Sequence, residues 1–223
     1  MKQYFIIISL ALLFSVTTLA QNGYNLLFKT SIKEVPEFVK TVSPSFSRLV
    51  CNDSSSFYFH VKGKKNPVKE GEVYGSRVFH HSFILFFDRD KQYSGYALPT
   101  SRKKHLYISD TIRHQAWVLT DSFKHIQGYK CRMAYQFMKN KFTNGGIEYF
   151  KHDSVFAWYT DQINLPFGPL YYYGLPGLIL EVYDQYMQGR LIECIKIQKE
   201  PVHIQIPEII TIIPAEEFRK RKK

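Results

Sequence analysis

An alternation of apolar and polar residues with a period of two is the feature that most constrains how this chain can fold. In GYKCRMAYQFM, residues 128–138, every second side chain from Tyr129 onward is apolar or aromatic, and most positions between them are basic or polar. The apolar set shares one face of an extended strand and consists of Tyr129, Cys131, Met133, Tyr135 and Phe137. This pattern predicts a half-buried strand whose apolar face joins a core.

Comparable patterns recur along the chain and are separated by turn residues. Strands are expected within residues 47–51, 56–61, 76–87, 105–110, 115–122, 155–163, 178–184, 190–200 and 204–213. Residues 52–56 and 185–189 have the composition of hairpin turns. Helical signals occur only at residues 34–43 and after Pro214. We therefore expect a mostly β fold, a curved antiparallel sheet or half-open barrel with few short helices, as one domain over residues 21–223.

Residues 1–20 have the layout of a secretory signal peptide. A single cation, Lys2, precedes an apolar run, and small residues lead to Ala20. The run ends before the roughly 20 apolar residues that a transmembrane helix needs. The residue after the expected cleavage site is Gln21 rather than cysteine, so a lipid anchor is not expected. We expect a mature chain without a transmembrane segment, exported to the periplasm, the cell surface or the medium.

The charge of the chain is strongly positive. The net charge is +11 at pH 7, and part of it lies in the tail RKRKK, residues 219–223. Such a tail can attract anionic lipid, lipopolysaccharide or nucleic acid, but the favoured interpretation is a solvated, frayed chain end. The other cations are spread out and lack the clustered aromatic motif of an RNA-binding sheet, so nucleic acid is not an expected partner.

The stretch GPLYYYGLPGLILEVYD, residues 168–184, combines glycines and prolines with an apolar run. Pro176 and Gly177 are the residues that a type II turn requires at its second and third positions, the glycine adopting a positive φ. Gly174 permits a second unusual dihedral angle. We interpret the stretch as a rigid corner that delivers an apolar strand into the sheet. A phosphate-binding loop would need a different glycine spacing and a following helix.

The same stretch carries a family resemblance. The hexapeptide from Gly174 to Ile179 resembles the signature of the GLPGLI family of secreted Bacteroidetes proteins. The resemblance extends over residues 115–197, with Leu170 standing where tryptophan is common and residues 164–166 replacing a tighter Ile-Pro pair. The matching positions are Ile126, Gly128, Tyr129, Cys131, Ala134, Trp158, Tyr159, Thr160, Ile163, Gly168, Pro169, Gly174, Leu175, Pro176, Gly177, Leu178 and Ile179.

This resemblance implies a secreted protein with no established activity, whose gene lies near genes for outer-membrane receptors or barrels. The expected strand order is also similar to the half-barrel sheets of periplasmic lipoprotein carriers, which hold acyl chains. That second likeness concerns the fold and carries little weight for function.

The eight histidines do not form a metal-binding motif in the sequence. His80 and His81 are adjacent and would point to opposite faces of a strand. His105, Asp110 and His114 would meet only through tertiary contact, and no HExxH motif is present. We predict no metal site and no cofactor.

Three acidic residues, Asp161, Glu181 and Asp184, lie around the glycine-rich corner. A hydrolase with paired carboxylates needs two of them to face each other across a cleft. Glu181 and Asp184 have opposite strand parity and are expected to point apart. We interpret them as part of a solvated sheet face and assign no catalytic residue.

The three cysteines, Cys51, Cys131 and Cys194, cannot all pair within one chain. Cys131 has three interpretations: a small core residue, a disulfide partner or a nucleophile. Its apolar strand face would raise the thiol pKa and make the thiol inert, which favours core packing. If a disulfide forms, Cys131 with Cys194 is the expected pair, since both lie in expected central strands.

These observations favour a non-enzymatic binding or envelope-associated protein. Aromatic residues make up 16% of the chain, and their strand faces could line a concave sheet that accepts a lipid or other apolar molecule, dock an outer-membrane protein, or simply fill a core. The alternative is a hydrolase or metal-dependent enzyme whose site is assembled from dispersed His, Asp, Glu and Cys residues. A structural component of an envelope assembly would instead expose a large apolar patch.

Overall fold

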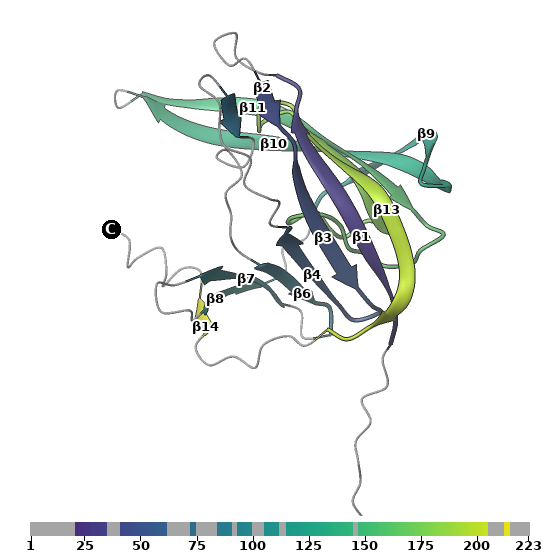
Figure 1. Ribbon diagram of the computed structural model, residues 1–223. Helices are drawn as coiled ribbons and strands as arrows, with labels where there is room; N and C mark the ends of the chain where they lie inside the picture. The colour runs from purple at the N-terminus through teal and green to yellow at the C-terminus, as the bar shows by residue number, and fades with distance from the viewer. Residues whose placement is uncertain are drawn as a thin grey trace, which may run out of the picture.

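The computed structural model describes residues 21–34, 41–61, 72–74, 84–90, 93–99, 105–111, 115–144, 147–204 and 212–214. Within these ranges every regular element is a β-strand (Figure 1). The strands are β1 (Gln21–Ile32), β2 (Thr41–Ser43), β3 (Ser45–Cys51), β4 (Ser55–His60), β5 (Glu72–Tyr74), β6 (Ile84–Asp88), β7 (Tyr93–Pro99), β8 (His105–Thr111), β9 (Val118–Ile126), β10 (Tyr129–Asn144), β11 (Ile147–Thr160), β12 (Leu178–Asp184), β13 (Arg190–Val202) and β14 (Ile212–Pro214).

Twelve of these strands form one sheet in the order β14-β8-β7-β6-β4-β3-β1-β13-β12-β11-β10-β9, and β2 pairs separately with β5. Neighbours in the large sheet are antiparallel except for the β14 and β8 pair, which is parallel. The sheet ends at β14 and β9 without closing, and it curves strongly between them (Figure 1). The expected curved antiparallel sheet is therefore confirmed.

The helices expected near the two ends of the mature chain are not confirmed. Thr41–Ser43 is strand β2, although residues 34–43 were expected to be helical, and Pro214 ends strand β14. A parallel partner strand, β5, supplies the backbone hydrogen bonds of residues 41–43, which overrides a weak local helix preference there. Residues 35–40, 215–223 and the expected signal peptide lie outside the described residues.

The two expected hairpins are present. Residues 185–189 connect β12 to β13, and the Asn52 side chain organises the turn between β3 and β4. Its Oδ1 accepts hydrogen bonds from the backbone N–H groups of Ser54 and Ser55, at 3.1 and 2.9 Å. Strand β1 was not expected from the sequence, yet it is central and pairs with both β13 and β3.

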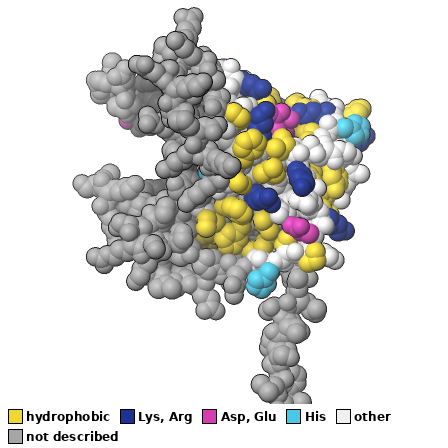
Figure 2. Space-filling view, viewed as in Figure 1, with side chains coloured by type: hydrophobic (Ala, Val, Ile, Leu, Met, Phe, Trp, Pro, Cys, Tyr) yellow, Lys and Arg dark blue, Asp and Glu magenta, His cyan; other side chains and the backbone are white. Residues whose placement is uncertain are grey.

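The surface over β1, β3 and β13 is mixed in character. Hydrophobic side chains gather there with Lys and Arg side chains spread among them (Figure 2). Phe46 of β3 and Ile195 of β13 are each 38% exposed. Partly exposed apolar residues interspersed with charged ones are normal on a protein surface.

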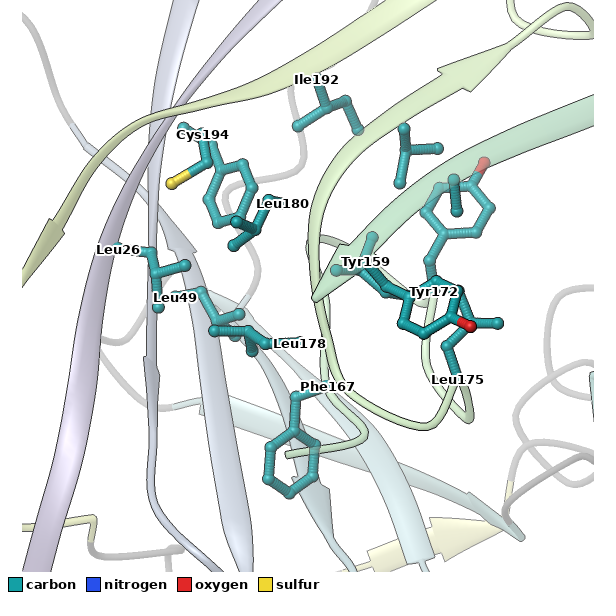
Figure 3. Close-up of a cluster of buried hydrophobic side chains, with 14 of the residues drawn as sticks. Leu26, Leu49, Tyr159, Phe167, Tyr172, Leu175, Leu178, Leu180, Ile192 and Cys194 are labelled. Carbon is teal, nitrogen blue, oxygen red and sulfur yellow. The ribbon is translucent and has the colours of Figure 1, made fainter. Parts of the chain in front are cut away.

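The core packs β1, β3, β12 and β13 against the segment of residues 163–177, which we call the corner segment (Figure 3). The largest fully buried side chains are Tyr159, Tyr172, Phe28, Phe167, Leu26, Leu49, Leu175, Leu178, Ile179, Leu180 and Ile192. Burial of a large apolar side chain stabilises a fold by about 1.5–3 kcal/mol. With Phe167, Tyr172 and Leu175 fully buried, the corner segment is a structural part of the core rather than a surface loop.

The expectation for the two faces of β10 holds at one end of the strand and fails at the other. Cys131 is buried, as expected, but Phe137 is 72% exposed. Gln136 and Ala134 lie opposite the fully buried Val155 and Ala157 of β11, and directly opposed residues point to the same side of a sheet. The even-numbered side of β10 therefore faces the core beyond the start of the strand.

Candidate functional site

The corner segment is hydrogen-bonded along the start of β12. The backbone N–H groups of Leu178 and Ile179 donate to the carbonyl oxygens of Ile163 and Phe167, at 3.0 and 2.9 Å. The Gly174 N–H donates to the Pro166 carbonyl at 2.9 Å, which closes the segment on itself. Backbone N–H groups within the hexapeptide from Gly174 to Ile179 are therefore occupied by structural contacts.

The turn at Pro176 differs from the expected type II turn. The Gly177 N–H donates to the Leu175 carbonyl at 2.8 Å, which is the hydrogen bond of a three-residue γ-turn centred on Pro176. The left-handed φ lies at Gly174, at +85°. Gly177 is required for a steric reason: an added Cβ would overlap the Thr160 carbonyl group and approach its carbon at 2.6 Å. The corner is a hydrogen-bonded turn, but its geometry differs from the expected one.

Gly168 is constrained in a similar way. A Cβ at this position would lie 2.6 Å from the Tyr172 carbonyl oxygen and 2.8 Å from the Cβ of Ile179. Gly168 and Gly177 therefore both mark places where the backbone packs directly on other backbone atoms.

A buried ion pair holds the corner segment to the β12–β13 hairpin. Arg190 Nη2 lies 2.7 Å from Asp184 Oδ2, and the Tyr172 hydroxyl donates to the same oxygen at 2.7 Å. Asp184 and Arg190 are only 1% and 3% exposed, so the expected solvated position of Asp184 is wrong. The hairpin turn brings Arg190 beside Asp184 on the core face, which makes burial of the carboxylate tolerable. Arg190 also donates to the Tyr171 hydroxyl at 3.1 Å.

The side chains of this cluster shift one another's pKa values. Burial alone would lower the pKa of the Arg190 guanidinium, but Tyr171, Tyr172 and Asp184 outweigh burial and raise that pKa. Burial, together with Tyr171 and Asp184, raises the pKa of the Tyr172 hydroxyl despite the opposing effect of Arg190. Arg190 therefore stays cationic and Tyr172 stays a neutral hydrogen-bond donor, which suits a structural cluster rather than proton transfer.

The strands and residues before β9 also contact the corner segment. The Phe87 ring of β6 meets the rings of Phe167 and Tyr173, with centroids 5.2 and 4.8 Å apart. The Trp117 indole N–H donates to the Tyr173 carbonyl at 2.9 Å, and the Gln115 amide donates to the Tyr171 carbonyl at 2.6 Å. The segment thus links both halves of the sheet, which is an architectural role.

Glu181 points away from Asp184, as its strand parity indicates. Lys124 of β9 binds both Glu181 carboxylate oxygens at 2.7 Å, and its ammonium lies 4.4 Å from the centre of the Trp158 ring. The Glu181 side chain is 16% exposed, so it is partly shielded rather than fully solvated. Asp161, in contrast, is exposed. The three acids do not form a paired-carboxylate site.

The histidines that were considered as metal ligands have no described side chains. His105 and Asp110 belong to β8, but their side chains lie outside what the structure describes, as do His80, His81 and His114. Among the described side chains, no group of three His, Cys, Asp or Glu residues could hold a metal ion.

The three cysteines are free and buried. Burial raises the pKa of Cys51 and Cys194 to about 12 and that of Cys131 to about 11. Strands β11 and β12 lie between Cys131 on β10 and Cys194 on β13. Neighbouring strands are about 4.8 Å apart, whereas a disulfide needs Cα atoms within about 7 Å. The strand order therefore favours core packing of Cys131. The disulfide between Cys131 and Cys194 stays a prediction.

Alkylation of the purified mature protein tests these alternatives. At pH 8 without reductant we expect no reaction of the folded protein with iodoacetamide, because buried neutral thiols are poor nucleophiles. After unfolding, still without reductant, intact mass should show three modified thiols. A single modified thiol that increases to three after reduction would instead establish a disulfide.

The same pKa shifts predict a loss of stability in alkali. The thiols of the unfolded chain titrate near pH 8.5, whereas in the folded protein burial raises the pKa of Cys51 to about 12 and that of Cys131 to about 11. Above about pH 8.5 the unfolded state releases protons that the folded state keeps, so stability present below that pH is lost as pH rises. The urea midpoint should fall between pH 8 and pH 10, and less steeply for Cys51→Ala. Equal pH slopes for the two proteins would contradict this account.

A row of aromatic rings, half-buried except for the exposed Phe137, crosses β10, β11 and β12, and we call it the aromatic row. It consists of Phe137, Tyr135, Phe156 and Tyr183. Successive ring centroids are 5.3, 6.4 and 6.4 Å apart, within the range of favourable aromatic contacts. The Tyr183 hydroxyl donates to Glu34 Oε1 at 3.2 Å, which fixes one end of the row.

The aromatic row lies on the side of the sheet that faces away from the core. Phe156 is paired with Tyr135 and Tyr183, whereas its neighbours Val155 and Ala157 are fully buried on the other side. Phe137, at the free end of the row, is 72% exposed. These side chains alternate in the sequence, but both faces of β11 are apolar. The buried face is set by the partner strands, so sequence reasoning did not single out this row.

A further exposed ring, Phe150, lies on the same side of the sheet, nearer the end of the β10–β11 hairpin. Phe150 is 52% exposed, and the Lys139 ammonium lies 4.1 Å from the centre of its ring. This surface offers flat apolar rings beside a cation, a combination suited to binding rather than to bond-making chemistry.

Comparisons with known proteins agree with the fold but name no activity. Residues 117–181 match a family described as "Protein of unknown function (Porph_ging)". No curated protein matches the sequence significantly. Two structures of PNGF-II, in space groups C2 and P21, are similar to this chain with TM-scores of 0.58 and 0.56 and sequence identities of 11% and 13%.

These structural matches cover 90% and 89% of this chain but only 32% of the PNGF-II chains, so the chain spans about a third of their length. At such low identity the likeness concerns the fold alone. Among the residues that the structure describes, none forms a helix long and apolar enough to cross a membrane.

Proposed function

We propose that this chain is an exported, non-enzymatic member of the GLPGLI family that binds a component of the cell envelope through the aromatic row. The observation that carries the proposal is the 72% exposure of Phe137, at the end of a continuous row of rings. Leaving a large ring in water forgoes stabilisation, and clustered exposed apolar groups mark interaction sites. The expected signal peptide and the family resemblance support placement in the periplasm or at the cell surface.

Binding accounts for the described side chains better than catalysis does. The three thiols, Tyr172 and Arg190, whose pKa values are all raised, are buried in structural contacts. Glu181 is held by Lys124 and Asp184 by Arg190. A hydrolase or metal-dependent enzyme would need reactive groups outside these contacts.

The position of the aromatic side chains also favours docking over a carrier for an apolar molecule. A carrier would place its rings on the inner side of the curved sheet. On that side Leu26, Phe28, Leu49 and Leu180 are fully buried against one another and the corner segment. The aromatic row lies on the opposite side of β10–β12, where a partner can reach it.

Envelope association of the mature protein tests this proposal. We expect the wild type to sediment with cell envelopes, and Phe137→Ser to reduce the bound fraction strongly, because an aromatic hot spot is worth about 2 kcal/mol or more. Phe123→Ser is the matched control, because Phe123 is 61% exposed and the Lys130 ammonium lies 4.7 Å from its ring centre. Phe123 pairs with Arg132, however, and lies on the side of the sheet opposite to the aromatic row. Equal envelope binding by wild type and Phe137→Ser would refute the role of the row.

A further inference from the structure

The outer part of the β10–β11 hairpin is a two-stranded ribbon. Strand β9 pairs with β10 only as far as Tyr135, and β12 pairs with β11 only from Val155. From Gln136 to Ser154 the ladder of the described sheet therefore contains β10 and β11 alone, and the two strands run together away from β12 (Figure 1). We call this segment the β10–β11 ribbon.

The core contacts the base of this ribbon. Met138 packs against the core cluster, and its partner Asp153 is 8% exposed. On the opposite side Phe137 and Phe150 are 72% and 52% exposed. An isolated two-stranded hairpin is marginally stable in water, so a ribbon that exposes rings gains stability when a surface covers them.

The side chains on the exposed side define the chemistry of that surface. Lys139 lies two residues from Phe137 on β10, so both side chains are on the same side. Phe150 lies two residues from His152 on β11, and His152 pairs with Lys139, so Phe150 is on that side as well. The Lys139 ammonium sits 4.1 Å above the Phe150 ring, so a cation accompanies the apolar groups. The whole chain carries a net charge of +11, which draws it toward an anionic surface.

We propose that the β10–β11 ribbon binds the surface of an anionic phospholipid bilayer. Phe137 and Phe150 enter the boundary between headgroups and acyl chains, and Lys139 interacts with lipid phosphate. A protein strand joining the ribbon would use its backbone edges and would not require rings on one face. The rings and the cation share a face instead, as interfacial binding requires. This inference rests on the proposed function and names the partner of that surface.

Vesicle sedimentation of the mature protein tests the inference. We expect binding to vesicles of mixed phosphatidylglycerol and phosphatidylcholine, weak binding to phosphatidylcholine alone, and weakening in high salt because charge attraction is screened. Removing both rings in Phe137→Ser/Phe150→Ser should weaken binding by roughly tenfold or more. Lys139→Gln should weaken it by roughly fivefold.

The control is again Phe123→Ser, which removes an exposed ring beside a lysine at the opposite end of β10 and should bind like the wild type. All variants alter exposed side chains, and unchanged thermal melting verifies that they fold. Equal binding to both vesicle types, or wild-type binding by the double variant, overturns the assignment of the ribbon to an anionic bilayer.

The two proposals fail in different ways. In the first case, the wild type fails to bind vesicles while its envelope association still depends on Phe137. The partner is then another molecule, such as a protein, and only the lipid inference is wrong. If both vesicle binding and envelope binding are absent, the proposed function fails as well.

Discussion

The Gly177→Val protein is expected to accumulate mostly unfolded or to melt at a much lower temperature than the wild type. A Cβ at this position overlaps the Thr160 carbonyl and lies 3.0 Å from the Asp161 Cα, and all these atoms belong to backbone that cannot rotate away. Overpacking typically costs about 1–3 kcal/mol and occasionally more, and we expect about 3 kcal/mol or more here because these backbone atoms cannot move aside. For a chain of this length that corresponds to a fall in Tm of roughly 6–12 °C or more.

Two other glycines provide controls for this substitution. Gly174 and Gly128 have φ values of +85° and +84°, and an added Cβ would meet nothing within 4 Å at either position. Alanine there adds only the strain of a left-handed backbone, about 1–2 kcal/mol. We therefore expect thermal melting to rank Gly177→Val far below Gly174→Ala and Gly128→Ala. If Gly177→Val melted like the wild type and lost envelope binding, the signature would be functional rather than structural.

The strands could be predicted from the sequence because alternation with a period of two reports local chain direction. Residues 178–184 and 190–200, for example, correspond closely to β12 and β13, and the turn between them was expected. Strand β1 lacks a strict alternation, and its central place depends on partners that are distant in sequence. Local pattern cannot reveal such partners.

The face that each strand buries was harder to predict, and the candidate site depends on it. Phe137 belongs to an apolar set in the sequence, so it was assigned to the core, yet the register of β10 with β11 exposes it. Asp184 was assigned to solvent because an acid is rarely buried without a partner. Its partner Arg190 reaches it only after the β12–β13 turn closes. Register and pairing, which are tertiary properties, decide both cases.

The glycine-rich corner shows what residue chemistry does predict. Glycine and proline indicated a rigid turn, and the corner segment is a buried, hydrogen-bonded turn. They did not distinguish a γ-turn at Pro176 from a type II turn, because both accept proline before glycine. The decisive contact, between Gly177 and Thr160, joins positions that no local rule connects.

Breaking the buried Asp184–Arg190 pair is expected to be the second large destabilisation. Asp184→Asn leaves the Arg190 guanidinium, 3% exposed, without its counter-charge, and Arg190→Met leaves the Asp184 carboxylate buried without a cation. Removing one partner of a buried pair costs about 3–5 kcal/mol, a large share of the roughly 5–15 kcal/mol that stabilises a domain. Urea unfolding of each variant at pH 7 measures this loss.

The double variant Asp184→Asn/Arg190→Met separates the charge from the shape of this cluster. It removes both charges, while the amide oxygen that replaces the carboxylate can still accept the hydrogen bond from Tyr172, so it should be more stable than either single variant. Lys124→Gln removes the more exposed Lys124–Glu181 ion pair, whose lysine side chain is 36% exposed, and should cost no more than about 1 kcal/mol. If the double variant were as unstable as the sum of the single variants, the two residues would act independently. The buried pair would then not be what holds the corner segment to the β12–β13 hairpin.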